Sequence, residues 1–261
     1  MRYRSWKFLL MANAPRDGKR RILDSRIGTA FSSILRPVYD FIFPPVCAGC
    51  GALIPSGVSK VCDSCWSSLA PVEPDDPLFV RTSSSLTSEG SIHGLLSLYH
   101  FEREGTLQTL VHQLKYAGMT SLGVEFGKRL GAKLREHWSG EYPSGILAMP
   151  LHAAKRRERG YNQSEYVSRG ISLVTGIPVM QGLVERQRYT VSQTNLNRPE
   201  RKKNVSGAFV ATTLAGKSIA GSTLLLVDDV VTTGATMVAC GRVLVDGGAS
   251  RIIAVSIALA E

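Results

Sequence analysis

Two neighbouring acids at the end of a strongly apolar run are the residues best suited to chemistry. The run 224–227 predicts a buried strand, and Asp228 and Asp229 follow it directly. In open α/β sheets, ligands bind at the carboxyl ends of the strands. Adjacent carboxylates suit the paired hydroxyls of a ribose, or a hydrated Mg²⁺ ion attached to them. The acid pair therefore predicts a site for a sugar.

A short threonine-rich loop follows the acids and leads into an apolar helical stretch. It consists of Thr232, Thr233, Gly234, Ala235 and Thr236. Backbone N–H groups at a helix start, together with three hydroxyls, can hold a phosphate monoester. We expect Gly234 to leave room for that phosphate because glycine has no side chain. An acidic strand end and an ordinary turn would each explain half of this pattern, but the two together predict a sugar phosphate site.

Four of the five cysteines form two C-x-x-C pairs with eleven residues between the pairs. Such pairs can present four thiolates to one tetrahedral ion, so Cys47, Cys50, Cys62 and Cys65 predict a zinc site. Because four thiolates close the coordination shell, we expect the zinc to be structural. Disulfides are the alternative, and they are disfavoured because the N-terminus lacks the apolar core of an export signal. Cys240 stands alone in an apolar stretch and is expected to be buried.

Positive charge is concentrated in two parts of the chain. The net charge is +10; residues 1–26 hold eight basic and two acidic residues, and residues 155–203 hold eleven basic and four acidic ones. These islands predict anionic partners, either phosphate groups or single-stranded DNA. No apolar run is long enough to span a membrane, so we expect a cytoplasmic protein without a membrane span.

Strand and helix signals alternate from Leu95 onward, which predicts an α/β domain with a parallel sheet. We expect four parts: a basic tail with an amphipathic segment (1–43), a zinc-ribbon-like module (44–70), a linker (71–94) and the α/β domain (95–261). The Ser/Thr-rich stretch 81–91 of the linker is expected to be a loop. The expected strands are 146–149, 178–180, 224–227 and 252–257, and the expected helices include 163–174 and 235–245.

Residues 227–236 resemble the phosphoribosyl pyrophosphate signature of type I phosphoribosyltransferases. Further segments are similar to the ComF family, phosphoribosyltransferase-like proteins linked with bacterial competence and DNA utilisation. They are Leu114–Gly118, Pro150–His152 with Arg156, Arg159–Gln163, and the stretch from Ser192 to Phe209. The cysteine module is similar to the zinc-binding segment of that family, and the resemblance covers residues 44–261. Tyr161 departs from the Phe that is more usual at its position.

The resemblance implies a type I phosphoribosyltransferase fold and assigns roles to single residues. Asp228 and Asp229 would hold the ribose hydroxyls of phosphoribosyl pyrophosphate, and the loop 232–236 would hold its 5′-phosphate. Mg²⁺ would accompany the diphosphate, which would lie near the basic segment after Pro150. Lys115, Arg156, Arg159 and Asn162 are the further residues that we expect to bind the ligand. The basic stretch 186–203 resembles the flexible hood that closes over such sites.

Two classes of function are compatible with these features. The first is a phosphoribosyltransferase that acts on an unidentified acceptor. The second is a non-catalytic ligand sensor or DNA-uptake adaptor that contacts single-stranded DNA or a motor protein through the basic islands. A plain nucleic-acid-binding zinc protein is a weaker third class, because no ladder of aromatic residues accompanies the charge.

Overall fold

The structure is a computed structural model, and it describes residues 41–261 except 56, 58, 141, 188–206 and 214–218. The chain divides after Pro44, and the sheet with its helices lies in the part 45–261. The basic tail, most of the hood-like stretch and the motif segment from Ser192 to Asn204 lie outside the described residues. Among the described helices, none has the length and apolar character needed to cross a membrane.

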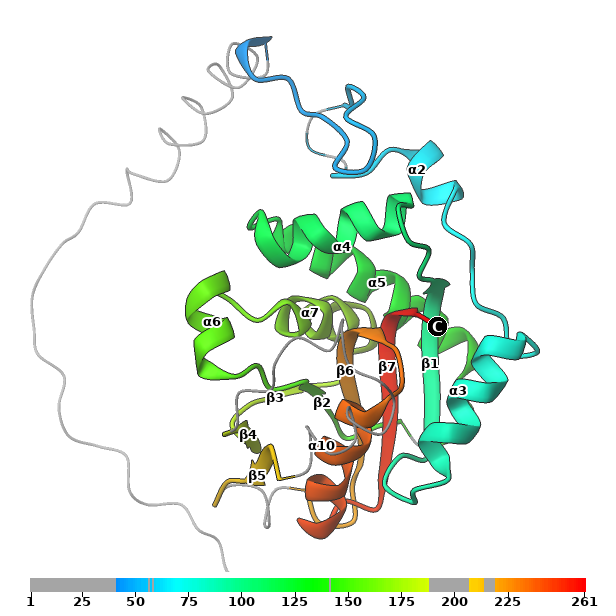
Figure 1. The fold of residues 1–261 in the computed structure, drawn as a ribbon, viewed down its shortest axis with the longest axis vertical. Helices are drawn as coiled ribbons and strands as arrows, with labels where there is room; N and C mark the ends of the chain where they lie inside the picture. The colour runs from blue at the N-terminus through cyan, green and yellow to red at the C-terminus, as the bar shows by residue number, and fades with distance from the viewer. Residues whose placement is uncertain (1–40, 56, 58, 141, 188–206, 214–218) are drawn as a thin grey trace, which may run out of the picture. The chain divides into compact units, whose positions relative to one another are not determined.

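A five-stranded parallel sheet forms the centre of the α/β domain (Figure 1), with strand order β1-β7-β6-β2-β3. Its strands are β1 (Gly94–His100), β2 (Gly145–Ala148), β3 (Val179–Met180), β6 (Thr223–Val231) and β7 (Arg251–Leu259). The prediction of a parallel α/β sheet is confirmed. The strands expected at 146–149, 178–180, 224–227 and 252–257 are all present, and β6 continues four residues beyond its expected end.

Both faces of the sheet are buried, as is typical of parallel sheets. Alternate residues of β6 belong to different cores: Leu225 and Val227 lie in one, and Leu224 and Leu226 in the other. The first core contains residues of α4 (Thr106–Tyr116), α5 (Thr120–His137) and α7 (Gln163–Thr175). The second contains residues of α10 (Ala235–Asp246) and α3 (Pro77–Thr87).

The remaining elements are short. They are α2 (Asp63–Ser67) in the cysteine module, α6 (Ala153–Arg159) after β2, and an antiparallel pair made of β4 (Val184–Arg186) and β5 (Phe209–Ala211). The helices predicted at 163–174 and 235–245 correspond to α7 and α10, each extended by one residue at its end.

The loop predicted at 81–91 is wrong, because most of that stretch belongs to helix α3. Pro77 occupies the first helical turn, and the Asp76 carboxylate accepts hydrogen bonds from the N–H groups of Leu78 and Phe79 at 2.7 and 3.4 Å. This is a well-formed helix start. Leu86 on this helix is fully buried, so tertiary packing overrides the weak helix propensity of the serines.

Candidate functional site

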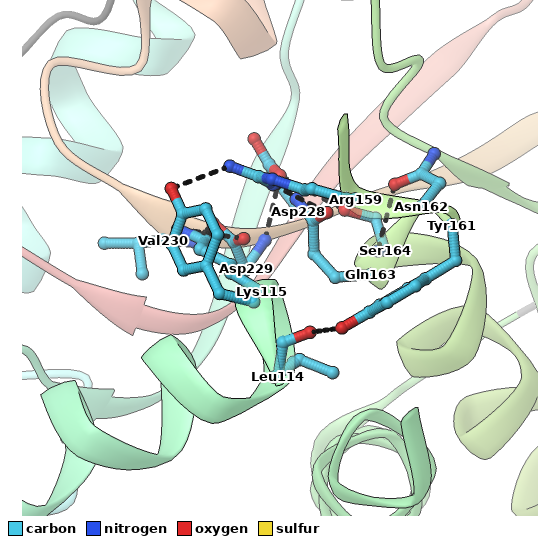
Figure 2. A network of polar contacts seen from close by, with 11 residues as sticks. Leu114, Lys115, Arg159, Tyr161, Asn162, Gln163, Ser164, Asp228, Asp229 and Val230 are labelled. Carbon is cyan, nitrogen blue, oxygen red and sulfur yellow. Dashed lines mark hydrogen bonds and ion pairs between the residues drawn. The ribbon is translucent and has the colours of Figure 1, made fainter. Parts of the chain in front are cut away.

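Asp228 and Asp229 lie within β6, near its carboxyl end, and side chains from two helices hold them (Figure 2). Asp228 Oδ1 accepts a hydrogen bond from Ser164 Oγ of α7 at 3.2 Å. Asp229 Oδ2 pairs with Lys115 Nζ of α4 at 3.0 Å. The structure therefore brings Lys115 to the acid pair, although it lies more than a hundred residues away in the sequence.

The protonation of the acid pair is unusual. Burial and then the neighbouring Asp229 carboxylate raise the pKa of Asp228 from 3.8 to about 7. The Asp229 N–H group, Lys115 and Ser164 act in the opposite direction and lower this pKa. Two carboxyl groups in one largely buried site do not readily ionise together, because their negative charges repel each other. A bound cation, or a ligand whose hydroxyls donate hydrogen bonds to the carboxylates, would therefore stabilise the ionised form of the pair.

Cationic side chains gather next to the acids. Burial lowers the pKa of Lys155 on α6, and three nearby cations lower it further, namely Arg159, Arg186 and Lys115. These four side chains come from α4, α6 and β4, so separate elements place positive charge in one region. Such a group of partly buried cations favours a multiply charged anion.

Arg159 is held in a defined position at the end of α6. Its Nη1 donates to Gln163 Oε1 at 2.9 Å, and its Nη2 donates to the Tyr116 hydroxyl at 3.3 Å (Figure 2). The guanidinium carbon lies 5.0 Å from the centroid of the Tyr116 ring. These contacts orient Arg159 next to Tyr116, which follows Lys115 on α4, and near Lys155. A ligand-binding role for Arg159 stays a prediction.

Two other predicted residues have different surroundings from those expected of ligand contacts. Arg156 forms an ion pair with Glu165 of α7 at 3.2 Å, and its side chain is well exposed. Asn162 is buried and caps α7: its Oδ1 accepts from Ser164 N at 3.2 Å, and its Nδ2 donates to Met149 O at 3.0 Å. Asn162 thus fixes the loop after β2 against α7. Ligand binding by Arg156 or by Asn162 stays a prediction.

The loop 232–236 follows β6, and its last two residues form the start of α10, as expected for a phosphate cradle at a helix start. Gly234 has φ = 72°, and a Cβ there would lie 2.3 Å from Leu86 Cδ2 of α3. The glycine is therefore required by its backbone angle and by α3, which the sequence analysis did not anticipate. Thr233 Oγ1 is buried without a hydrogen-bond partner among the described residues. An orphaned buried hydroxyl is costly, and a bound oxyanion would satisfy it.

A hollow of about 300 Å³ opens beside this loop, between α3, α10 and β5. Thr233 and Ala235 line it, together with Phe209, Val238 and Arg242, whereas neither acid does. The hollow therefore borders the expected phosphate cradle but not the expected ribose site.

The structure brings to the site three residues that were not among the predicted site residues. Ser164 and Gln163 follow Asn162 at the start of α7, and Arg186 ends β4. Gln163 belongs to the family motif and Ser164 follows it, so both could have been found from their place at a helix start. Arg186 begins the hood-like stretch, but only its charge distinguishes it there.

The four cysteines of the predicted zinc site lie together, with all four sulfur atoms within 4.8 Å of one another. The sulfurs of Cys50 and Cys62 are 3.8 Å apart, far longer than a disulfide bond. Zn–S bonds of about 2.3 Å in a tetrahedron place neighbouring sulfurs about 3.8 Å apart, so the residues fit a zinc ion.

Hydrogen bonds to sulfur also favour a metal-binding thiolate in this cluster. Cys47 Sγ accepts from the N–H groups of Gly49 at 3.4 Å and Cys62 at 3.3 Å. Burial raises the pKa of Cys47, but backbone N–H groups outweigh it and lower this pKa to about 6. Burial raises the pKa of Cys65 above its usual range. Cys240 is fully buried on α10, as predicted.

Two protein-family models match the chain. The model described as a phosphoribosyl transferase domain matches residues 117–260, and the model described as a double zinc ribbon domain matches residues 38–77. The first covers more than half of the chain and contains the acids, the loop 232–236 and Arg159. The second contains all four cysteines of the cluster.

Curated relatives carry names from DNA utilisation and competence. The DNA utilization protein YhgH of Salmonella typhimurium is 28% identical over 149 residues, which are 56% of this chain and 64% of YhgH. Competence protein F of Haemophilus influenzae is 31% identical over 110 residues, 42% of this chain and 48% of that protein. The matched part is therefore less than two thirds of each relative's length.

Similar solved structures include two enzymes that are named for phosphoribosyl compounds. Glutamine phosphoribosylpyrophosphate amidotransferase from B. subtilis is 18% identical, with a TM-score of 0.36, and the match covers 55% of this chain and 30% of the enzyme. Adenine phosphoribosyltransferase from Leishmania tarentolae is 15% identical, with a TM-score of 0.35 and coverage of 63% and 91%. At these scores the fold assignment rests on the family match and the strand order.

Proposed function

Because this chain belongs to the ComF family and carries its phosphoribosyl transferase domain and zinc ribbon, we propose that its acid pair and threonine loop bind phosphoribosyl pyrophosphate with Mg²⁺. The observation that carries the proposal is the arrangement at the end of β6. Two acids, one with a raised pKa, precede a loop with an orphaned buried hydroxyl, and cations from three elements lie beside them. A ligand with hydroxyls, a phosphate and a diphosphate matches all three features.

Each part of the ligand has a counterpart in the chain. Asp228 and Asp229 would accept hydrogen bonds from the ribose hydroxyls, and the loop 232–236 would donate to the 5′-phosphate. Lys115, Arg159 and Lys155 would face the diphosphate. Mg²⁺, when bound with the ligand, would neutralise diphosphate charge and so help it to leave.

In the transfer reaction, the bond between C1′ and the diphosphate oxygen breaks, and its electron pair leaves with the diphosphate. A lone pair of the acceptor forms the new bond to C1′, and the acceptor's proton passes to solvent or to the departing diphosphate. The cations of the site stabilise the charge that develops on the leaving group, and Asp228 and Asp229 fix the ribose ring. The acceptor is a nucleophile that the described residues do not identify.

The test separates binding from transfer. Calorimetry with phosphoribosyl pyrophosphate and Mg²⁺ should show binding, and ribose 5-phosphate should compete because it carries the same hydroxyls and phosphate. A diphosphate-release assay with candidate amines and bases then tests turnover. Absence of binding would contradict the proposal.

Tight binding without diphosphate release for any acceptor would favour the second candidate, a ligand-sensing adaptor. The names of the relatives place them in DNA utilisation and competence, and we propose the same setting for this chain. In that setting, the net positive segment 155–203 would contact single-stranded DNA or a motor protein. If the intact protein does not bind single-stranded DNA even at low salt, this would argue against DNA contact by the segment.

A further inference from the structure

The cysteine module contacts α4, the helix that supplies Lys115 to the acid site, and α5, the next helix along the chain. Helix α4 has 11 residues, which correspond to about 16 Å of helix. Its first residue lies against the module, and its last residues lie in the site. Residues 117–119 connect it to α5, which also contacts the module.

The first C-x-x-C pair packs tightly against the start of α4. A Cβ added to Gly49 would lie 3.0 Å from Cys65 Sγ and 3.1 Å from Thr106 Cγ2, so the Gly49 backbone fills the space between the second cysteine pair and α4. Ser68, at the end of α2, has its Oγ 3.5 Å from Thr106 Oγ1. The position of the first turn of α4 therefore depends on the fold of the module.

The segment before the second pair is fastened to α5. Glu125 accepts hydrogen bonds from Ser59 Oγ at 2.8 Å and from Lys60 N at 3.1 Å. Trp66, next to Cys65, packs edge-on against Phe126 with ring centroids 5.2 Å apart. The module thus contacts both helices through polar and aromatic groups at once.

At the other end of α4, the three consecutive residues Leu114, Lys115 and Tyr116 contact three parts of the site, and Figure 2 labels the first two. The first accepts a hydrogen bond from the Tyr161 hydroxyl through its backbone carbonyl. The second places its Nζ 3.0 Å from Asp229 Oδ2, and the third accepts a hydrogen bond from Arg159 Nη2 at 3.3 Å. A shift of α4 would move all three contacts together.

We propose that the metal-bound cysteine module positions Lys115, so that loss of the metal loosens the Lys115–Asp229 pair and weakens ligand binding at the acids. Four thiolates released from one ion no longer hold the turns that meet Thr106 and Glu125, because metal binding and local folding are coupled in such modules. Helix α4 then keeps its buried apolar face but loses the support of its first turn. The statement about ligand binding rests on the proposed function, whereas the statement about Lys115 does not.

The first experiment measures Lys115 directly and needs no ligand. The full chain, with zinc bound or after removal of zinc by a chelator, is treated with acetic anhydride, and the labelling rate of each lysine is followed by mass spectrometry. Lys115, which is ion-paired and largely buried, should react several-fold faster without zinc. Lys128, exposed on α5, is the control and should react equally in both samples. Equal Lys115 rates, with zinc loss verified by metal analysis, would overturn the proposal.

The second experiment compares the effect of zinc removal on ligand affinity in the wild type and in the Lys115→Gln variant. Zinc removal should weaken phosphoribosyl pyrophosphate binding about tenfold in the wild type, as expected for one lost contact to a charged group. It should have no further effect in Lys115→Gln, because the contact is already absent. An equal loss of affinity in both proteins would indicate general damage to the domain and overturn the proposal. If the zinc-bound wild type does not bind the ligand, the proposed function fails, and the labelling experiment still decides this inference.

A variant that keeps all four cysteines guards against unfolding of the zinc-free chain. Glu125→Ala removes both hydrogen bonds between α5 and the segment 59–60 and should speed Lys115 labelling with zinc still bound. Glu136→Ala, at an exposed position of the same helix, is the matched control and should leave labelling unchanged. Unchanged Lys115 labelling in Glu125→Ala with zinc bound would show that the hydrogen bonds to α5 do not help to position Lys115, and would contradict that part of the proposal.

Discussion

Replacement of Asp228 by asparagine should stabilise the protein at neutral pH while weakening its ligand binding. Burial and then the Asp229 charge raise the pKa of Asp228 from 3.8 to about 7. Between these two pH values the folded state binds more protons than the unfolded state, so the free energy of unfolding falls as the pH rises. Each pKa unit corresponds to about 1.4 kcal/mol, so the ionised Asp228 side chain lowers stability by roughly 4 kcal/mol above pH 7.

Asparagine does not titrate, and it keeps the oxygen that accepts hydrogen bonds from Ser164 Oγ and from the N–H group of Asp229. Urea unfolding of both proteins should show an excess stability of the variant that grows from about 1 kcal/mol near pH 4.5 to roughly 4 kcal/mol near pH 8. Asp246→Asn, at an exposed position of α10, is the control and should show little change. An excess stability that is constant or shrinks as the pH rises would refute the reasoning.

The remaining predictions concern the loop, the metal and the basic tail. Gly234→Ala should destabilise the protein by about 1–3 kcal/mol in a thermal melt, because φ is positive and the new Cβ would meet Leu86. In a Leu86→Ala background the same change should cost less, because the steric clash is gone and only the backbone strain remains. Metal analysis should find about one zinc per chain in the wild type and none in Cys62→Ser, and four freely reactive thiols in the wild type would contradict the zinc site. Deletion of residues 1–26 should reduce the salt dependence of single-stranded DNA binding, and an unchanged slope would show that the tail does not contact DNA.

The part of the site that is continuous in sequence could be predicted without a structure. An apolar strand, two acids and a threonine loop before a helix are neighbours in the chain, so their order already determines their arrangement in β6, the loop 232–236 and α10. The cysteines could be predicted for the same reason, since their spacing is set by the geometry of one tetrahedral ion.

Contacts between distant segments could not be predicted from local patterns. The pairing of Lys115 with Asp229 depends on how α4 packs beside β6, and the role of Gly234 depends on a helix at 77–87 whose apolar positions are separated by serines and threonines. Asn162 belongs to a family motif, but a motif does not reveal that its amide caps α7 and binds the carbonyl of Met149. Tertiary packing decides all three cases.

We propose above all that Asp228 and Asp229 hold the ribose of a bound phosphoribosyl ligand. The most direct measurement is calorimetric titration of phosphoribosyl pyrophosphate and Mg²⁺ into the wild type and into the Asp228→Asn, Asp229→Asn double variant at one pH and salt concentration. We predict binding to the wild type and an affinity lower by about a hundredfold or more in the folded double variant, because two charge-assisted contacts are lost. Equal affinity of the two proteins would contradict the account.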